Sequence, residues 1–217
     1  MVWNFSTLEL KIASHRLFIV SYRFMNKDVV VIDIETKNTF YDVGGQANIA
    51  RLEMSLACVY SYNQDAYLSF WENDTKELGE LLKEAALVVG FSINRFDLPV
   101  LDKYFDFNTK ALKRIDLLEE IEVVLGKRIG LDLLAETNLG ENKTHSGLEA
   151  IRLWNEGNLK ELEAYCLNDV KITKGLYDLA KLQKYLMVPE KGTSNLIRVD
   201  LDFNEKIKTA TTENTLF

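Results

Sequence analysis

Runs of apolar residues predict strands in the first half of the chain. The segment 28–35 (DVVVIDIE) is an apolar, β-branched run of strand length, continuous enough for a strand that is buried on both faces. Segments 52–63 and 66–73 meet at a polar turn, 63–65, and have the composition of two further strands. A short apolar run at 87–91 predicts a fourth buried strand. We therefore expect the amino-terminal half to supply most of a sheet.

Apolar residues at helical spacing predict helices between and after these strands. Shorter helices are expected at 75–86, 96–105, 118–126, 131–140 and 147–157. The longest helical pattern runs from Leu159 to about Leu186, with apolar residues along one flank. The segment 112–118 fits either a strand or a loop. Strands followed by helices, with alternation in the middle, predict an α/β fold: a mixed central sheet of about five strands flanked by helices.

The two ends of the chain differ in composition from its centre. Residues 1–24 carry three basic residues and one acidic residue, and this balance changes at Met25. The change fits an amino-terminal appendage in front of a main domain at 25–190, and an additional edge strand at 17–22 is an equal alternative. The last segment, 191–217, holds one candidate strand at 195–203 and a polar tail that we expect to be frayed.

If residues 1–24 are an appendage, their deletion should leave the fold nearly intact. The measurement is the melting temperature of the shortened chain. About 1 kcal/mol of stability shifts the melting temperature of a domain of this size by roughly 2–4 °C. A loss of several degrees would therefore contradict the appendage and show that the segment completes the sheet.

Composition narrows the class of protein. The 217 residues are 47% hydrophobic and 27% charged, as in an ordinary globular domain, and they contain no apolar run long enough for a membrane span. The two cysteines, Cys58 and Cys166, form no C-x-x-C pair and no disulfide framework, which favours a reducing, cytoplasmic location and burial as small hydrophobes. The net charge of −7 argues against a generic polyanion binder, which needs a strongly basic surface.

Two acidic residues stand at the end of the first predicted strand. The period of two places Val31, Asp33 and Glu35 on the same face of that strand. Like charges on a buried strand are costly unless a cation offsets them. An Asp-x-Glu sequence also arises by chance on solvated loops, so the position of this pair, at the end of an apolar strand, is what favours metal binding.

A third acid, Asp169, lies in the middle of the long predicted helix. It follows Tyr165 by four residues and shares a helical face with Leu162. An aspartate within an apolar stripe needs a partner. A salt bridge to Lys171 or Lys174 is the structural alternative, but both lysines lie off the stripe. The position therefore favours a functional role.

A fourth acid, Asp97, follows a predicted buried strand and opens a helix. On its own it is an ordinary helix-start aspartate that caps free N–H groups. Together with Asp33, Glu35 and Asp169 it completes a set of carboxylates that could converge. Oxygen ligands select hard cations such as Mg²⁺ or Mn²⁺, and the sequence has no His/Cys cluster for zinc. Enzymes that cleave phosphodiester bonds are known to use such a set of carboxylates to hold two ions about 4 Å apart.

Three segments in order resemble the motifs of a known family, the DEDD 3′–5′ exonucleases of the ribonuclease-H-like fold. The DIET of 33–36 resembles the first motif, GFSINRFDLPVL at 90–101 the second and YCLND at 165–169 the third. Each motif is weak alone, whereas three in this order are specific. The resemblance covers about residues 28–186.

Tyr165 places the resemblance in the DEDDy branch. The DEDDh branch needs a histidine at the position of Ala164. Within the DEDDy branch the chain is similar to the bacterial YprB-like group and to exonucleases related to the proofreading domain of family B polymerases. The segment 139–157 (LGENKTHSGLEAIRLWNEG) also resembles that group.

The resemblance implies a two-ion site for Mg²⁺ or Mn²⁺. It implies that Asp33, Glu35 and Asp169 hold the first ion, that Asp33 bridges to the second, and that Asp97 reaches the second ion directly or through water. It implies further that Tyr165 orients the attacking water. These five residues are the expected catalytic set.

The resemblance also implies contacts to substrate. The backbone around Thr36 would receive the terminal 3′-hydroxyl, and Phe96 would pack beneath Asp97. Ser92 stands where the family often has asparagine, with Asn94 nearby, so either residue is a candidate for a polar contact to the scissile end. Candidate phosphate contacts, with solvated loop residues as the alternative, are Lys127, Arg128, Lys143 and His145.

The function implied is metal-dependent 3′–5′ exonuclease activity on the 3′ end of single-stranded DNA or RNA. A helicase or polymerase would be a separate chain, because this sequence shows no such part. The alternative is a catalytically silent ribonuclease-H-like module that binds nucleic acid or protein. Such modules usually lose one or more of the acids, and all four are present here.

Overall fold

A computed structural model of the chain describes residues 27–141, 147–190 and 192–203. The possible strand at 17–22, the appendage at 1–24, Lys143, His145 and the polar tail lie outside the described residues. No helix within the described ranges is both long and apolar enough to cross a membrane.

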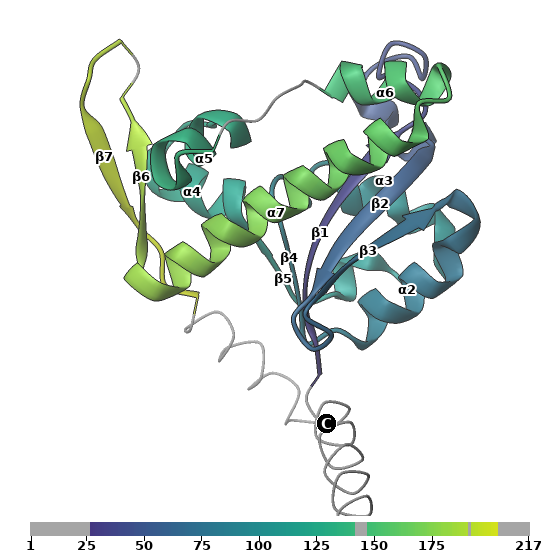
Figure 1. Cartoon of the computed structure of the whole chain (residues 1–217), viewed down its shortest axis with the longest axis horizontal. Coiled ribbons are helices and arrows are strands. Elements are labelled where there is room, and N and C mark those ends of the chain that lie inside the picture. The colour runs from purple at the N-terminus through teal and green to yellow at the C-terminus, as the bar shows by residue number, and fades with distance from the viewer. Residues whose placement is uncertain (1–26, 142–146, 191, 204–217) are drawn as a thin grey trace, which may run out of the picture.

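The centre of the fold is a mixed sheet of five strands. The strands are β1 (Val29–Thr36), β2 (Met54–Ser61), β3 (Ala66–Trp71), β4 (Leu87–Gly90) and β5 (Arg114–Asp116). Their order is β3-β2-β1-β4-β5, with β1 antiparallel to β2 and parallel to β4, so β1 lies in the middle (Figure 1). The predicted mixed sheet is confirmed, and the segment that fitted a strand or a loop contains strand β5.

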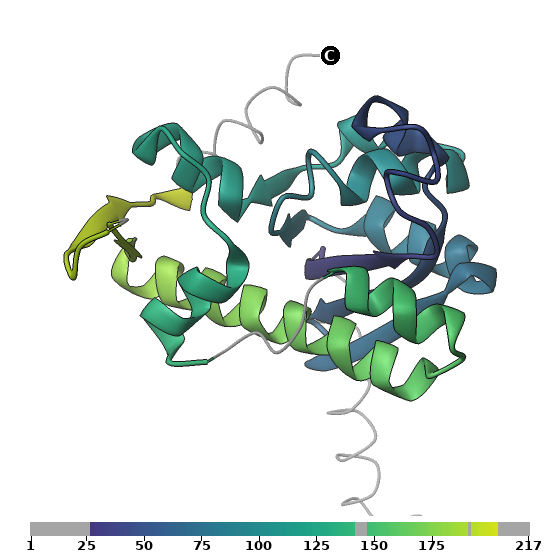
Figure 2. The same cartoon turned by 90° about the horizontal axis from the view of Figure 1, so that it is seen from above.

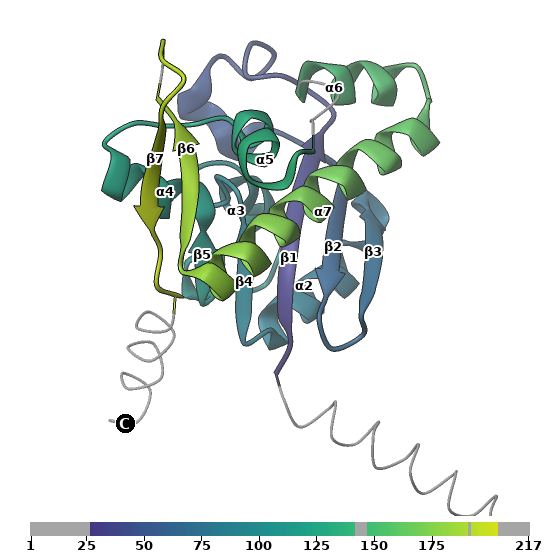
Figure 3. The ribbon, with the colours of Figure 1, turned by 60° about the vertical axis from the view of Figure 1, so that its left-hand side comes forward.

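Helices cover both faces of this sheet. The long helix α7 (Leu159–Gln183) crosses one face, as Figures 1 and 3 show, and Val31 of β1 shares a buried core with it. Helices α2 (Thr75–Glu84) and α3 (Asp97–Leu101) lie on the other face, where their apolar residues pack on Ile32 and Ile34. The view from above separates the two layers (Figure 2). The alternation along β1 therefore sends odd-numbered side chains toward α7.

The remaining elements connect these layers. Three further α-helices are α4 (Leu117–Leu125), α5 (Leu131–Leu139) and α6 (Gly147–Asn155). Short 3-10 helices are η1 (Gln46–Arg51), η2 (Glu72–Asp74), η3 (Asp102–Tyr104) and η4 (Thr109–Ala111). The helix expected at 96–105 is divided between α3 and η3, so only its first part is α-helical.

The predicted end of the long helix is wrong by about three residues. Helix α7 stops at Gln183, and Lys184 adopts a left-handed conformation (φ 66°) that ends it. From Tyr185 the burial alternates, with Leu186 and Val188 buried, so this segment is a strand, not a helical turn. A glycine commonly marks such a helix end, but a lysine occupies the position here, so the sequence gives no signal that the helix stops.

That strand, β6 (Tyr185–Pro189), pairs antiparallel with β7 (Leu196–Asp200) in a separate two-stranded sheet. The strand predicted at 195–203 is thus present in shorter form. The hairpin packs against α4, α5 and α7 and adds buried residues such as Val199 to their core (Figure 3). The β6–β7 hairpin therefore has one strand on each side of the expected domain boundary between residues 190 and 191.

Candidate active site

The carboxyl end of β1 carries two acids on the face that is covered by α7. In the β1–β2 register Asp33 lies opposite Cys58 and Glu35 opposite Leu56, and both partners belong to the core beneath α7. Glu35 is buried and Asp33 is half-buried. The strand therefore directs two charges into a largely apolar environment, which is unfavourable without a compensating cation.

Helix α7 brings a third acid to the same place. Tyr165 and Asp169 lie one helical turn apart, and both are buried. Carboxylate oxygens of Asp33, Glu35 and Asp169 lie within 4.8 Å of one another. Acids separated by more than 130 residues in sequence thus form one cluster of oxygen donors that could hold a metal ion.

Asp97 lines the same cavity as this cluster. It is the first residue of α3, and its Oδ1 accepts a hydrogen bond of 3.1 Å from the backbone N–H of Ile34, between the two acids of β1. A role limited to capping its own helix does not account for this bond. Burial raises the pKa of Asp97 to about 7, and the charges of Asp116 and Asp169 act in the same direction. A cation at this point would favour the ionised form.

The loop from β4 to α3 delivers Asp97 to this position. Gly90 ends β4, and a Cβ there would overlap the side chain of Ile93 and lie 3.0 Å from the carbonyl oxygen of Ile32. Ser92 then adopts a left-handed conformation with φ 69°. The tight reversal that follows places the start of α3 beside β1.

A buried thiol touches the acid at the centre of the cluster. The Sγ of Cys166 lies 3.5 Å from the carbonyl oxygen of Asp33 and 3.8 Å from its Oδ2. Burial raises the pKa of the Cys166 thiol well above its usual range, so the group stays protonated and can donate. Cys58 and Cys166 are both buried and free, as predicted.

These acids line a cavity of about 570 Å³. Its acidic side is formed by the four carboxylates, beside Tyr165. Its apolar side is formed by Phe40, Tyr41, Leu52, Phe91, Phe96, Leu148 and Ile151. Tyr41 is 92% exposed and Leu148 is 69% exposed, so these two residues offer apolar surface at the rim. The cavity can therefore receive a ligand that combines a charged group with a flat apolar group.

Only some of the residues predicted to contact substrate line the cavity. Thr36 and Ser92 line the cavity, and the Thr36 hydroxyl donates to the carbonyl oxygen of Asn38 at 3.0 Å. Asn94 does not line the cavity. Its side chain instead accepts from Arg114 and donates to Glu119.

Other predicted contacts fall at the edges of the site. Phe96 lines the cavity and meets the ring of Phe40 edge-on, with centroids 6.0 Å apart. The guanidinium of Arg128 donates to the Ser92 hydroxyl at 3.2 Å, although Arg128 does not itself line the cavity. Lys127 is exposed and also lies outside the lining.

Most of the apolar wall was not predicted from the sequence. Phe40 and Tyr41 follow the first motif closely, and two adjacent aromatic residues before the Gly44–Gly45 turn are a signal that could have been used. Leu148 and Ile151 looked like ordinary positions of an amphipathic helix. Only the placement of α6 over the end of β1 shows that they face the cavity.

Comparisons with known proteins agree with the expected fold. A family model described as RNase_H superfamily matches residues 30–181, more than half of the chain. The structure is similar to the crystal structure of Trypanosoma brucei RNase D, with a TM-score of 0.55 and 15% identity, over 89% of this chain and 67% of that one. At this identity the likeness shows the fold alone. No curated protein matches the sequence.

A weaker likeness is to exonuclease I. The Escherichia coli enzyme in a zinc-bound complex with single-stranded DNA gives a TM-score of 0.45 at 14% identity, over 73% of this chain and 41% of that one. A second exonuclease I structure gives a TM-score of 0.48 at 14% identity, over 72% and 41%. The present chain thus spans about two fifths of the length of exonuclease I.

Proposed function

We propose, since the chain belongs to the RNase_H superfamily, that it is a metal-dependent 3′–5′ exonuclease of the DEDDy type acting on single-stranded nucleic acid. The observation that carries the proposal is the meeting of Asp33, Glu35, Asp97 and Asp169 with Tyr165 in one cavity. The shared fold with RNase D supports the proposal. A silent binding module would have no need of four acids gathered at such an energetic cost.

The donor set fits hard divalent cations. All four candidate ligands are carboxylates, which suit Mg²⁺ or Mn²⁺ better than softer metals. Asp33, Glu35 and Asp169 would hold one ion, because their oxygens lie within 4.8 Å of one another. Asp33 would also face the second ion, together with Asp97, which lines the same cavity. Both Asp97 and Asp169 are only 2% exposed, so their charges have little water to stabilise them.

Bound cations would supply the Lewis acidity that activates water and offsets charge on the leaving oxygen of a phosphodiester. The protein's own contribution is orientation. Tyr165 lies one turn before Asp169 on α7 and faces the same cavity, where its hydroxyl can hold a water in line with the scissile bond. The backbone near Thr36 and the Ser92 hydroxyl are the proposed contacts to the terminal nucleotide.

The apolar wall favours a single strand over a duplex. Phe96 and Tyr41 offer aromatic rings on which unpaired bases can stack, and such stacking tolerates any base. Leu148 adds apolar contact beside them. Bases in a duplex are already stacked and paired, so a duplex end must first be opened at an energetic cost. The proposed substrate is therefore a free 3′ end with several unpaired nucleotides.

Incubation of a 5′-labelled single strand with the protein and Mg²⁺ tests the proposal. The labelled strand should shorten progressively from its far end and release mononucleotides, and EDTA should stop the reaction. The same strand annealed to its complement should be trimmed more slowly. Internal cuts, or equal cleavage in EDTA, would contradict the exonuclease assignment.

A further inference from the structure

Asp116 is a buried acid that lies outside the cavity yet joins two elements near it. It ends β5 and caps α4, where its Oδ1 accepts from the backbone N–H groups of Leu118 at 3.1 Å and Glu119 at 3.3 Å. The same carboxylate also reaches the β4–α3 loop. Its Oδ1 accepts from the N–H of Ser92 at 2.8 Å, and its Oδ2 accepts from the N–H of Asn94 at 2.9 Å. A helix cap alone needs only the first pair of bonds.

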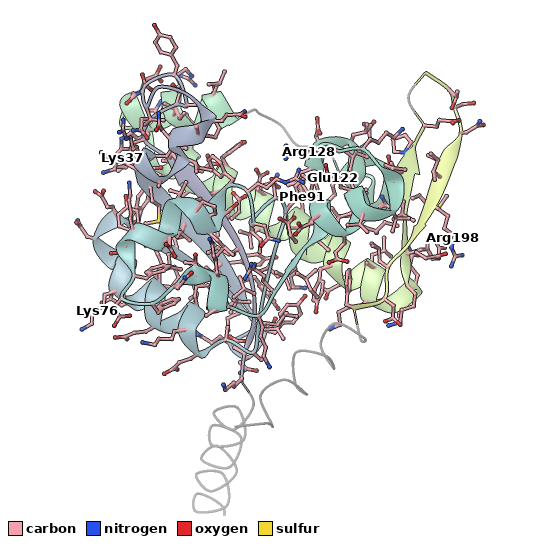
Figure 4. All side chains as sticks on the ribbon, turned by 180° about the vertical axis from the view of Figure 1, so that it is seen from behind. Lys37, Lys76, Phe91, Glu122, Arg128 and Arg198 are labelled. Carbon is pink, nitrogen blue, oxygen red and sulfur yellow. The ribbon has the colours of Figure 1, made fainter. Side chains whose placement is uncertain are left out.

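Side chains from the same region hold the loop a second time. The Asn94 amide bonds to Arg114 and Glu119, and Arg95 forms an ion pair of 2.7 Å with Glu122. Figure 4 labels Glu122, the partner of Arg95 in this ion pair. Residues of β5 and α4 therefore hold the β4–α3 loop through bonds to the loop's backbone and to the loop's side chains.

These bonds hold the β4–α3 loop in a conformation that is otherwise unfavourable. Ser92 is not glycine, and its left-handed conformation (φ 69°) is unfavourable unless the surroundings enforce it. The bonds from the N–H groups of Ser92 and Asn94 to the two carboxylate oxygens of Asp116 together supply that constraint. Internal bonds from Phe96 N–H to the Ser92 carbonyl and from Leu98 N–H to the Ile93 carbonyl then carry the fixed position forward to α3.

We propose that Asp116 is a positioning residue, which fixes the β4–α3 loop and through it the place of the Asp97 carboxylate in the metal centre. The Oδ1 of Asp97 accepts from the Ile34 N–H, and the residue lines the same cavity as the acids of β1 and α7. Both contacts require one fixed position of Asp97. Because α3 has only five residues, the loop, and not the helix, sets where Asp97 stands. This assignment rests on the proposed function, since it concerns the same centre.

The substitution Asp116→Asn separates this role from helix capping. Asparagine keeps an oxygen that can cap α4, and it is as good a cap as aspartate. Its amide nitrogen, however, replaces Oδ2, so it cannot accept from the Asn94 N–H and would instead face that N–H with its own. Of the two bonds that hold the loop, the one to Asn94 is then lost and the one to Ser92 is kept. We expect Mn²⁺ affinity, measured by calorimetry without substrate, to fall by about 10- to 100-fold, as is typical for partners that orient metal ligands. On an oligonucleotide, kcat should fall while KM changes little.

A matched control is Asp28→Asn, at the opposite end of β1. Asp28 likewise accepts from a backbone N–H, that of Asn63 at 2.9 Å, and from the Ser61 hydroxyl. Its loss should lower the melting temperature and leave Mn²⁺ affinity unchanged. If Asp116→Asn also lowers only the melting temperature, the positioning role is overturned.

A double-mutant cycle with Asp97→Asn gives the sharpest test. If Asp116 acts through Asp97, the double variant should bind Mn²⁺ as weakly as Asp97→Asn alone, because the second change has nothing left to displace. Losses that add would overturn the inference. Should Asp116→Asn fail to fold, Asp116→Ser keeps one oxygen that can cap α4 and removes the second acceptor that holds the loop, and Mn²⁺ affinity equal to wild type would overturn it as well. A wild-type protein that binds no Mn²⁺ would overturn the proposed function itself.

Discussion

Replacement of Asp33 by alanine is expected to abolish cleavage. Asp33 is the one acid proposed to face both cations, and its carboxylate stands among those of Glu35 and Asp169 within 4.8 Å. Without it, neither ion has a complete set of protein ligands. Single-turnover cleavage of a labelled strand should fall to background, and a calorimetric Mn²⁺ titration should show fewer ions bound.

The same substitution is expected to raise stability when metal is absent. Removing one of several crowded carboxylates relieves repulsion in the metal-free protein, as is common where function is maintained at the expense of stability. A gain of about 1 kcal/mol would raise the melting temperature in EDTA by roughly 2–4 °C. Asp106→Ala is the control, because its carboxylate is exposed and pairs only at 3.5 Å with Lys83. Two ions bound to Asp33→Ala as in wild type would contradict its bridging role.

Replacement of Tyr165 by phenylalanine is expected to lower kcat by roughly 10²–10³. The ring, which α7 directs into the core, remains in place, so the fold and Mn²⁺ affinity should be kept. Only the hydroxyl that holds the attacking water is lost. KM for the oligonucleotide should change little, since this group is proposed to act in the chemical step.

The matched control for Tyr165 lies on the same helix. Tyr177 is also buried, and its ring packs against Tyr62 and Phe203, away from the cavity. Tyr177→Phe therefore removes one hydroxyl of the same kind without touching the site, and its kcat should equal that of wild type. Cleavage by Tyr165→Phe at the wild-type rate would make the Y-x-x-x-D segment a packed helix and nothing more.

Local sequence patterns were sufficient to find three of the four acids but not their arrangement. The period of two along β1 and the spacing of four on α7 depend only on neighbouring residues, so Asp33, Glu35 and Asp169 stood out as charges on apolar faces. Asp97 did not, because a helix-start aspartate is ordinary. Its bond to Ile34, 63 residues earlier in the chain, is visible only in the fold.

The parts that were missed depend on long-range contacts. Asp116 lies in a segment that fitted a strand or a loop, and its four backbone partners come from two separate elements. The stop after Gln183 is set by a left-handed lysine and by burial of Leu186 and Val188 in the shared core. Neither feature leaves a periodic or compositional trace in the sequence.

The central claim is that the cluster of acids drives cleavage through bound cations. The most direct measurement is single-turnover cleavage of a 5′-labelled single strand while Mn²⁺ is titrated into metal-free protein. No product is expected without metal, and the rate should rise in parallel with calorimetric occupancy of the sites and return to zero in excess EDTA. Product formed in EDTA, or a rate that does not follow occupancy, would contradict the claim.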